Sequence, residues 1–147
     1  MAGTLTHSPA DVLRRVLIAL AQGTDPSDNG AWPIYASREP NLPDNAITVY
    51  DTQGRDDGRR QTDGERMEHF GFQVRTRAID FPTGYTKARA VAVVMDKNIY
   101  DEAVTLDSTN YLLHSVSRTT DVLYIGDDPA SRRALFTVNG VLTVKQV

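Results

Sequence analysis

The strict alternation of residues 69–77 constrains the fold of this chain more than any other feature. Phe70, Phe72, Val74 and Thr76 alternate with His69, Gly71, Gln73, Arg75 and Arg77. A period of two predicts a β-strand with one buried face and one exposed face. The segment Ala46–Tyr50 alternates in the same way, with Ile47 and Val49 on one face, and we expect it to pair with this strand.

Two segments have the period of an amphipathic helix. Ser8 and Pro9 supply an N-cap and a first helical residue, Asp11 places an acid in the first turn, and Gly23 is the expected residue after the C-cap. The apolar stripe of this first helix consists of Leu13, Val16, Leu17 and Leu20. Gly84–Lys97 is predicted to be the second helix, with a stripe formed by Tyr85, Ala88, Val91, Ala92 and Met95.

The rest of the chain is dominated by strand patterns. Trp32–Ala36 can only be a short or edge strand, because Pro33 has no N–H to donate. Further strands are predicted at Ala103–Leu106, Tyr111–Ser117, Asp121–Ile125 and Ala134–Val147. The order helix, strands, helix, strands predicts an α+β fold, a mainly antiparallel β-sheet with two helices packed on it, as a single domain over residues 1–147.

The segment 51–65 contains no aliphatic residue, so nothing in it anchors to a core. We therefore expect a flexible, solvated loop, and long loops of this kind are either functional or disordered. Its acids, which include Asp56 and Asp57, are interleaved with Arg55, Arg59 and Arg60. This mixture disfavours a cation site and leaves three alternatives open: a solvated disordered loop, contact with a partner's carboxylates or phosphates, and nucleic-acid contact.

Asn139-Gly140 poses a choice between two structures. Between two apolar strand segments this dipeptide is a strong signal for a β-hairpin turn. We favour one long last strand instead, because little chain remains after Gly140 and a glycine within a strand can mark a bulge or a close backbone approach.

Composition and motifs exclude several classes of function. The chain has no cysteine, which removes thiolate chemistry, and its net charge of -3 offers no broad basic surface for nucleic acid. The longest apolar run, Val16–Ala21, is too short to cross a membrane. The common hydrolase, nucleotide-binding and zinc motifs are absent, and His7, His69 and His114 show no catalytic spacing. We expect a protein that is not an enzyme and that needs no cofactor.

One segment begins like a calcium-binding loop and then departs from it. Residues 25–30 place potential oxygen ligands at the first, third and fifth positions and Gly30 at the sixth. Ala36 stands where the bidentate glutamate is required, so we interpret the segment as a turn and expect no metal.

Four segments, taken in order, resemble the minor capsid or tail-terminator proteins of tailed bacteriophages. They are Asp44–Thr52, Phe72–Arg77, Ile125-Gly126-Asp127-Asp128 and Phe136–Asn139, and together they span most of the chain. Each segment is a weak signal alone, and their order carries the resemblance.

The resemblance implies a structural assembly protein of the virion, present in the host cytoplasm during assembly. Such a protein forms a ring, usually hexameric, that caps the tail tube, stops its polymerisation and joins the tail to the head. The implied partners are further copies of the chain, the tail tube protein and a head-completion or neck protein, with no membrane. DNA would pass an acidic lumen without specific binding.

For the interaction surface, the candidates are the charged residues of the 51–65 segment and two arginines of the following strand: Arg55, Asp56, Asp57, Arg59, Arg60, Arg75 and Arg77. The alternative for the last two is a polar outer face of a half-exposed sheet. Two other functions stay open, namely another tube or neck component of the phage tail and, at lower weight, a small metal-dependent enzyme that uses the acidic segment.

Overall fold

The computed structural model describes residues 5–59 and 66–147. Within these residues, two α-helices, one 3₁₀ turn and seven strands follow one another. They are α1 (Pro9–Ala19), η1 (Pro26–Asp28), β1 (Ile34–Ala36), β2 (Ala46–Arg59), β3 (Arg66–Ala78), α2 (Phe81–Lys97), β4 (Tyr100–Leu106), β5 (Thr109–Arg118), β6 (Leu123–Asp127) and β7 (Ala134–Gln146).

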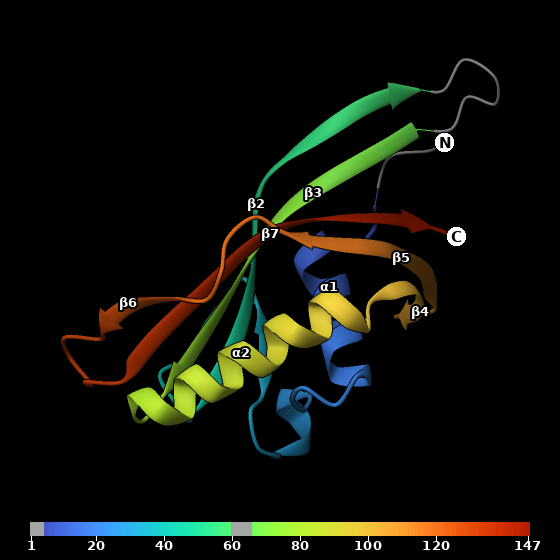
Figure 1. Cartoon of the computed structure of the whole chain (residues 1–147). Coiled ribbons are helices and arrows are strands. Elements are labelled where there is room, and N and C mark those ends of the chain that lie inside the picture. Colours follow the sequence, from blue (N-terminus) through green and yellow to red (C-terminus); the bar gives the residue numbers. More distant parts are fainter. Residues whose placement is uncertain (1–4, 60–65) are drawn as a thin grey trace.

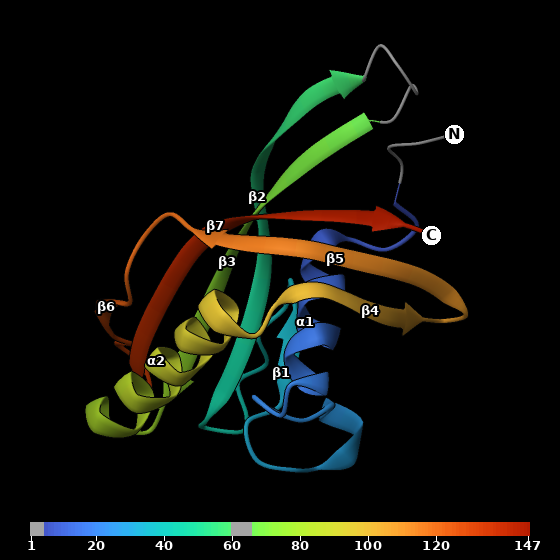
Figure 2. The ribbon, with the colours of Figure 1, turned by 45° about the vertical axis from the view of Figure 1, so that its right-hand side comes forward.

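The seven described strands form one mixed, mostly antiparallel sheet in the order β1-β2-β3-β7-β5-β4, with β6 also paired to β7. Only β1 runs parallel to its neighbour among the described pairs. The sheet curls over the two helices (Figures 1 and 2). The predicted α+β class is confirmed, and so is the pairing of the two alternating segments. The pair is antiparallel and places Val49 opposite Val74.

Both helices bury their apolar faces in one core with the inner face of the sheet. From α1 this core takes Val12, Leu13, Val16 and Leu17, and from α2 it takes Val91, Ala92 and Met95. Phe72, Tyr111 and Leu142 are among the largest fully buried strand residues. The predicted stripes are therefore the packed faces, with the exception of Tyr85, which is 45% exposed.

The beginnings of both helices are fixed by side-chain caps. Ser8 accepts a hydrogen bond from the Asp11 amide, as the sequence predicts, and Asp80 accepts one from the Thr83 amide. The Asp80 cap and Pro82 start α2 at Phe81, three residues before the predicted start at Gly84.

The end of α1 differs from the prediction. The helix ends at Ala19, and Ala21, with φ 62°, takes the left-handed position that was expected of Gly23. The amides of Ala21 and Gln22 bond back to the carbonyls of Ile18 and Leu17, which is the Schellman arrangement. Glycine adopts the left-handed conformation at lower cost than alanine, so the sequence does not predict an alanine at this position.

The predicted loop over residues 51–65 is wrong for residues 51–59. These residues continue β2, which pairs with β3 as far as Arg59 opposite Arg66, with register shifts along the way. Backbone hydrogen bonds between strands do not depend on aliphatic side chains, so a polar segment can extend a strand. Residues 60–65 lie outside the described part of the chain, and so does that part of the loop prediction.

The choice of one long last strand is confirmed. β7 runs without a break through Asn139 and Gly140, which lie opposite Gln73 and Phe72. A Cβ at residue 140 would come within 2.6 Å of both the Phe72 ring and the Ser117 carbonyl oxygen. Glycine is therefore required here by close approach and not by a turn.

Candidate functional site

A two-stranded arm extends beyond the body of the sheet (Figure 1). We define the arm as residues 55–59 of β2 and residues 66–68 of β3. β1 pairs with β2 only as far as Val49, and β7 pairs with β3 only from His69. Neither neighbour therefore reaches the arm.

The arm holds four of the predicted surface residues, namely Arg55, Asp56, Asp57 and Arg59. Arg60 lies outside the described residues. A ribbon of two strands is marginally stable by itself in water, and the sequence gives the arm no aliphatic residue in β2 beyond Tyr50 with which to form a core. An arm of this composition gains stability when another surface packs against it.

Arg75 and Arg77 lie at the opposite end of β3, where they face Thr48 and Ala46. At about 3.3 Å per residue, Arg66 and Arg75 are roughly 30 Å apart along the strand. The structure therefore does not bring these two arginines together with the charges of the arm.

Arg77 is buried, with 4% of its surface exposed, so the alternative that it lies on an exposed polar face of the sheet is wrong for this residue. Its guanidinium donates to the carbonyl oxygens of Pro40 at 2.7 Å, Pro43 at 2.6 Å and Asp44 at 3.3 Å. Burial lowers the pKa of Arg77, and the nearby Glu39 carboxylate opposes that effect. The guanidinium stays charged and uses its fork of donors to hold the loop formed by residues 39–45.

A second buried arginine completes this clamp. Arg133 donates to the Asn41 carbonyl oxygen at 2.6 Å and to Asn41 Oδ1 at 2.9 Å. Sequence reasoning missed Arg133, because it follows a turn and no pattern separates it from a solvated arginine.

Arg75 is partly exposed and lies over the Tyr50 ring, 5.7 Å from its centroid. It also approaches Glu39 Oε2 at 3.6 Å. Burial and the Glu39 carboxylate raise the pKa of Tyr50. Of the two strand arginines, Arg75 alone has solvent-accessible surface that another protein can contact.

An aromatic cluster lies at the other end of the molecule, between the start of α2 and β6. Phe81, Tyr85 and Tyr124 surround the buried Phe136, with the rings of Phe81 and Tyr124 4.9 Å apart. These three residues are 41–47% exposed. Sequence reasoning missed the cluster because it joins residues from a helix and from two strands.

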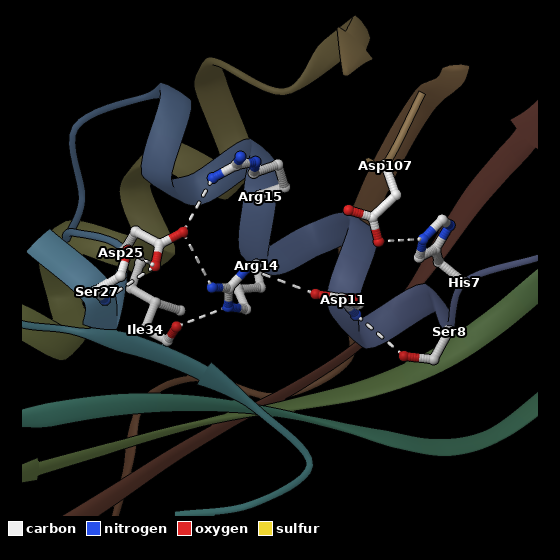
Figure 3. Close-up of polar contacts among 9 residues, drawn as sticks. All are labelled: His7, Ser8, Asp11, Arg14, Arg15, Asp25, Ser27, Ile34 and Asp107. Atoms are coloured by element: carbon white, nitrogen blue, oxygen red, sulfur yellow. Dashed lines mark hydrogen bonds and ion pairs between the residues drawn. The ribbon is translucent and has the colours of Figure 1, made fainter. Parts of the chain in front are cut away.

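The polar face of α1 is engaged in contacts within the chain (Figure 3). Arg14 Nε donates to the Ile34 carbonyl oxygen at 2.7 Å, and its other nitrogens lie 3.5 Å from Asp11 and Asp25. Asp25 also accepts bonds from the amide and hydroxyl of Ser27, which lower its pKa. The segment that begins like a calcium loop is thus a capped turn.

The histidines contact separate partners. His7 lies 2.7 Å from the Tyr111 hydroxyl, His69 lies 2.8 Å from the Thr143 hydroxyl, and His114 lies 2.9 Å from Asp101. Within the described ranges, no group of three or more potential metal ligands is found. No helix in the same ranges is long and apolar enough to cross a membrane.

A family model for bacteriophage tail terminator proteins matches residues 16–134. The chain belongs to the bacteriophage tail terminator family. The resemblance found in the sequence is confirmed. No curated protein matches the chain.

Family membership makes this tail terminator a structural, non-enzymatic component of the phage tail. It implies a tail-capping role and an interaction with the tail tube. This family membership also rules out the alternative of a small metal-dependent enzyme, which was suggested by the acidic residues of the 51–65 segment.

Proposed function

We propose that this tail terminator forms a hexameric ring that caps the completed tail tube and joins it to the head. A ring that matches the last tube ring on one face, but cannot accept another tube subunit on its other face, ends a stacking series. The second face then contacts a head-completion or neck protein. The subunits assemble from the host cytoplasm and lie at the head–tail interface of the virion.

The projecting arm is the observation that carries this proposal. Within one subunit, neither neighbouring strand pairs with this charged two-stranded ribbon, and a ribbon of two strands is only marginally stable in water. A ring offers such a ribbon the surface of the next subunit. We assign Arg55, Asp56, Asp57, Arg59 and Arg60 to that contact, in which guanidinium and carboxylate groups of neighbouring subunits pair.

The two strand arginines take different roles in this proposal. Arg75 contributes its exposed part to the surface near the 39–45 loop, whereas Arg77 acts from within by holding that loop in place. The net charge of -3 per subunit gives a ring an acidic overall character. DNA would therefore pass the lumen without specific binding.

The proposal is tested by adding the purified protein to tail tubes from a phage that lacks the terminator gene, followed by electron microscopy. We expect a ring of sixfold symmetry at one end of each tube and recovery of head joining. Protein bound along the tubes, or tubes made of the protein itself, would instead indicate a tube component.

Arg59→Glu tests the role of the arm in the same experiment. We expect this variant to form fewer rings, because it reverses one charge of a contact between subunits. Lys145→Glu is the matched control, since it makes the same charge change at an exposed residue near the end of β7. Equal loss of rings in both variants would contradict the assignment of the arm.

A further inference from the structure

The base of the arm decides where the arm points. Residues 55–59 of β2 include no aliphatic side chain, so packing within the arm does little to stiffen it. The last pair between β3 and β7 joins His69 to Thr143, and beyond it the arm and the end of β7 run in different directions (Figures 1 and 2). We define the junction as residues 51–53 of β2 and residues 69–71 of β3. Its contacts must set the direction of the arm.

β2 bulges at the junction. Thr52 pairs with Gly71, and the next pair joins Arg55 to His69. This step covers three residues of β2 but only two of β3, so β2 carries one extra residue. A β-bulge bends the strand that carries the extra residue and increases its twist. The bulge therefore turns the arm at the point where β7 leaves β3.

Gly71 allows β2 to pass close to β3 at this bulge. A Cβ at residue 71 would lie 2.3 Å from Thr52 Oγ1 and 2.4 Å from the Gln53 carbonyl oxygen. The second contact is with backbone, so no rotation of a side chain relieves it. Glycine is therefore required here by close approach. A side chain at this position would push Gln53, and the arm that follows it, away from β3.

Asp51 ties the junction to α1. Its Oδ1 accepts a hydrogen bond from the Ala10 amide, in the first turn of the helix, at 2.9 Å. Ser8 accepts the bond of the next amide, that of Asp11, so the two acceptors serve different groups of the same helix end. Neighbouring residues of a strand point to opposite faces of the sheet. Asp51 therefore holds one face of β2, and the close approach to Gly71 lies on the other.

We propose that Gly71 and Asp51 are positioning residues that aim the arm before the ring assembles. The arm then meets the next subunit already in its bound direction, so binding does not cost the freedom of a swinging arm. The inference rests on the proposed function and adds to it how the contact between subunits is prepared.

The direction of the arm is measured in the free protein as the distance between two spin labels, by pulsed electron paramagnetic resonance. The chain has no cysteine, so Glu68→Cys in the arm and Ala103→Cys on β4 create the two labelling sites. We expect one narrow distribution of distances, which Gly71→Ala shifts or broadens. A distribution that is already broad, or that Gly71→Ala leaves unchanged, would overturn the inference.

Gly71→Ala, without labels, is then compared with the wild type in the ring assay on tubes that lack the terminator. If the released arm points correctly about a tenth of the time, about tenfold more protein is needed for the same number of rings. Gly23→Ala is the matched control, because its Cβ would also meet a backbone carbonyl oxygen at 2.3 Å and a side chain at 2.6 Å, but beyond the other end of α1. We expect it to form rings as the wild type does at temperatures where it is folded.

Asp51→Ala tests the second positioning residue and carries the test if Gly71→Ala does not fold. Ser8→Ala is its matched control, since each substitution removes an acceptor at the start of α1 but only Asp51 belongs to β2. We expect Asp51→Ala to need about threefold more protein than Ser8→Ala for the same number of rings. Asp51→Asn keeps an oxygen that can accept the Ala10 bond, so we expect it to recover most of that difference.

The outcomes separate the inference from the proposed function. If the wild type forms no rings on tubes, the proposed function is wrong, and the label distances alone decide whether the junction aims the arm. If the wild type forms rings and both junction variants form them as readily, the inference is wrong and the function stands. If the two control variants lose rings to the same extent as the junction variants, the loss follows stability alone and the inference is overturned.

Discussion

Ala21 occupies a backbone position that glycine fills at lower cost. A non-glycine residue in the left-handed region costs roughly 1–2 kcal/mol, and Ala21 has φ 62°. We therefore expect Ala21→Gly to raise the free energy of unfolding by up to about 1 kcal/mol, measured by urea denaturation.

Gly23→Ala is the counterpart of this substitution. A Cβ at residue 23 would meet the Trp32 carbonyl oxygen at 2.3 Å and the Ile34 side chain at 2.6 Å. We expect it to destabilise the protein by about 1–3 kcal/mol. If Ala21→Gly were destabilising, the C-terminal cap of α1 described above would be incorrect.

Arg77 is expected to contribute more to stability than Arg75, although the two residues lie on the same strand. Arg77→Lys removes the fork of donors by which a buried guanidinium binds three carbonyl groups, so we expect a loss of about 2–4 kcal/mol in unfolding free energy. Arg75→Lys loses one ion-pair contact at 3.6 Å and a ring contact, and we expect a loss below about 1 kcal/mol. Equal losses would contradict the clamp.

The residue scale also shows which local rules predict structure. Ser8 could be assigned as a cap from the sequence because its bond to the Asp11 amide depends only on neighbouring residues. The burial of Arg77 could not be predicted, because it depends on a loop more than 30 residues away in the sequence. Strand alternation gives the face of a residue but not what covers it.

At the scale of elements, an ion pair joins α2 to β5. Arg118 Nε and Nη2 bind the two oxygens of Asp96 at 2.8 and 2.7 Å, and these bonds hold the pKa of Asp96 below its ordinary value. A carboxylate with a lowered pKa stabilises the fold above the unfolded pKa and loses this effect as the pH falls through the folded pKa.

Asp96→Asn tests this linkage. We expect the variant to be less stable than the wild type at neutral pH by less than about 1 kcal/mol, because the pair is partly exposed. The difference should shrink as the pH falls below about 4. Urea denaturation at a series of pH values measures it, and a difference that stayed constant down to pH 2 would contradict the linkage.

The elements themselves were largely predictable from sequence, and the errors have physical causes. Both helices, and the pairing of Ala46–Tyr50 with the alternating segment 69–77, follow from apolar periodicity, whereas the register of that pair does not. The extension of β2 to Arg59 was missed because periodicity reports burial, whereas the arm is held by backbone hydrogen bonds to β3. In β7, chain length after Gly140 was a better guide than the local turn signal.

At the scale of the whole molecule, the candidate surfaces lie apart from one another. The arm extends from one end of the sheet, whereas β6 and the start of α2, which contribute Tyr124, Phe81 and Tyr85 to the aromatic cluster, lie at the other (Figure 2). The charged residues of the arm could be selected from sequence because a polar segment stands out. The aromatic cluster could not be, since Phe81, Tyr124 and Phe136 come together only through the fold.

The most direct test of the tail terminator account is inactivation of the gene in its phage, followed by electron microscopy of the lysate. We expect overlong or unjoined tails beside DNA-filled heads, because nothing would stop the tube or connect it to the head. Restoring the intact gene in trans should recover complete particles. Tails of normal length joined to heads would contradict the account, and a complete absence of tails would assign the protein to the tube or its assembly core.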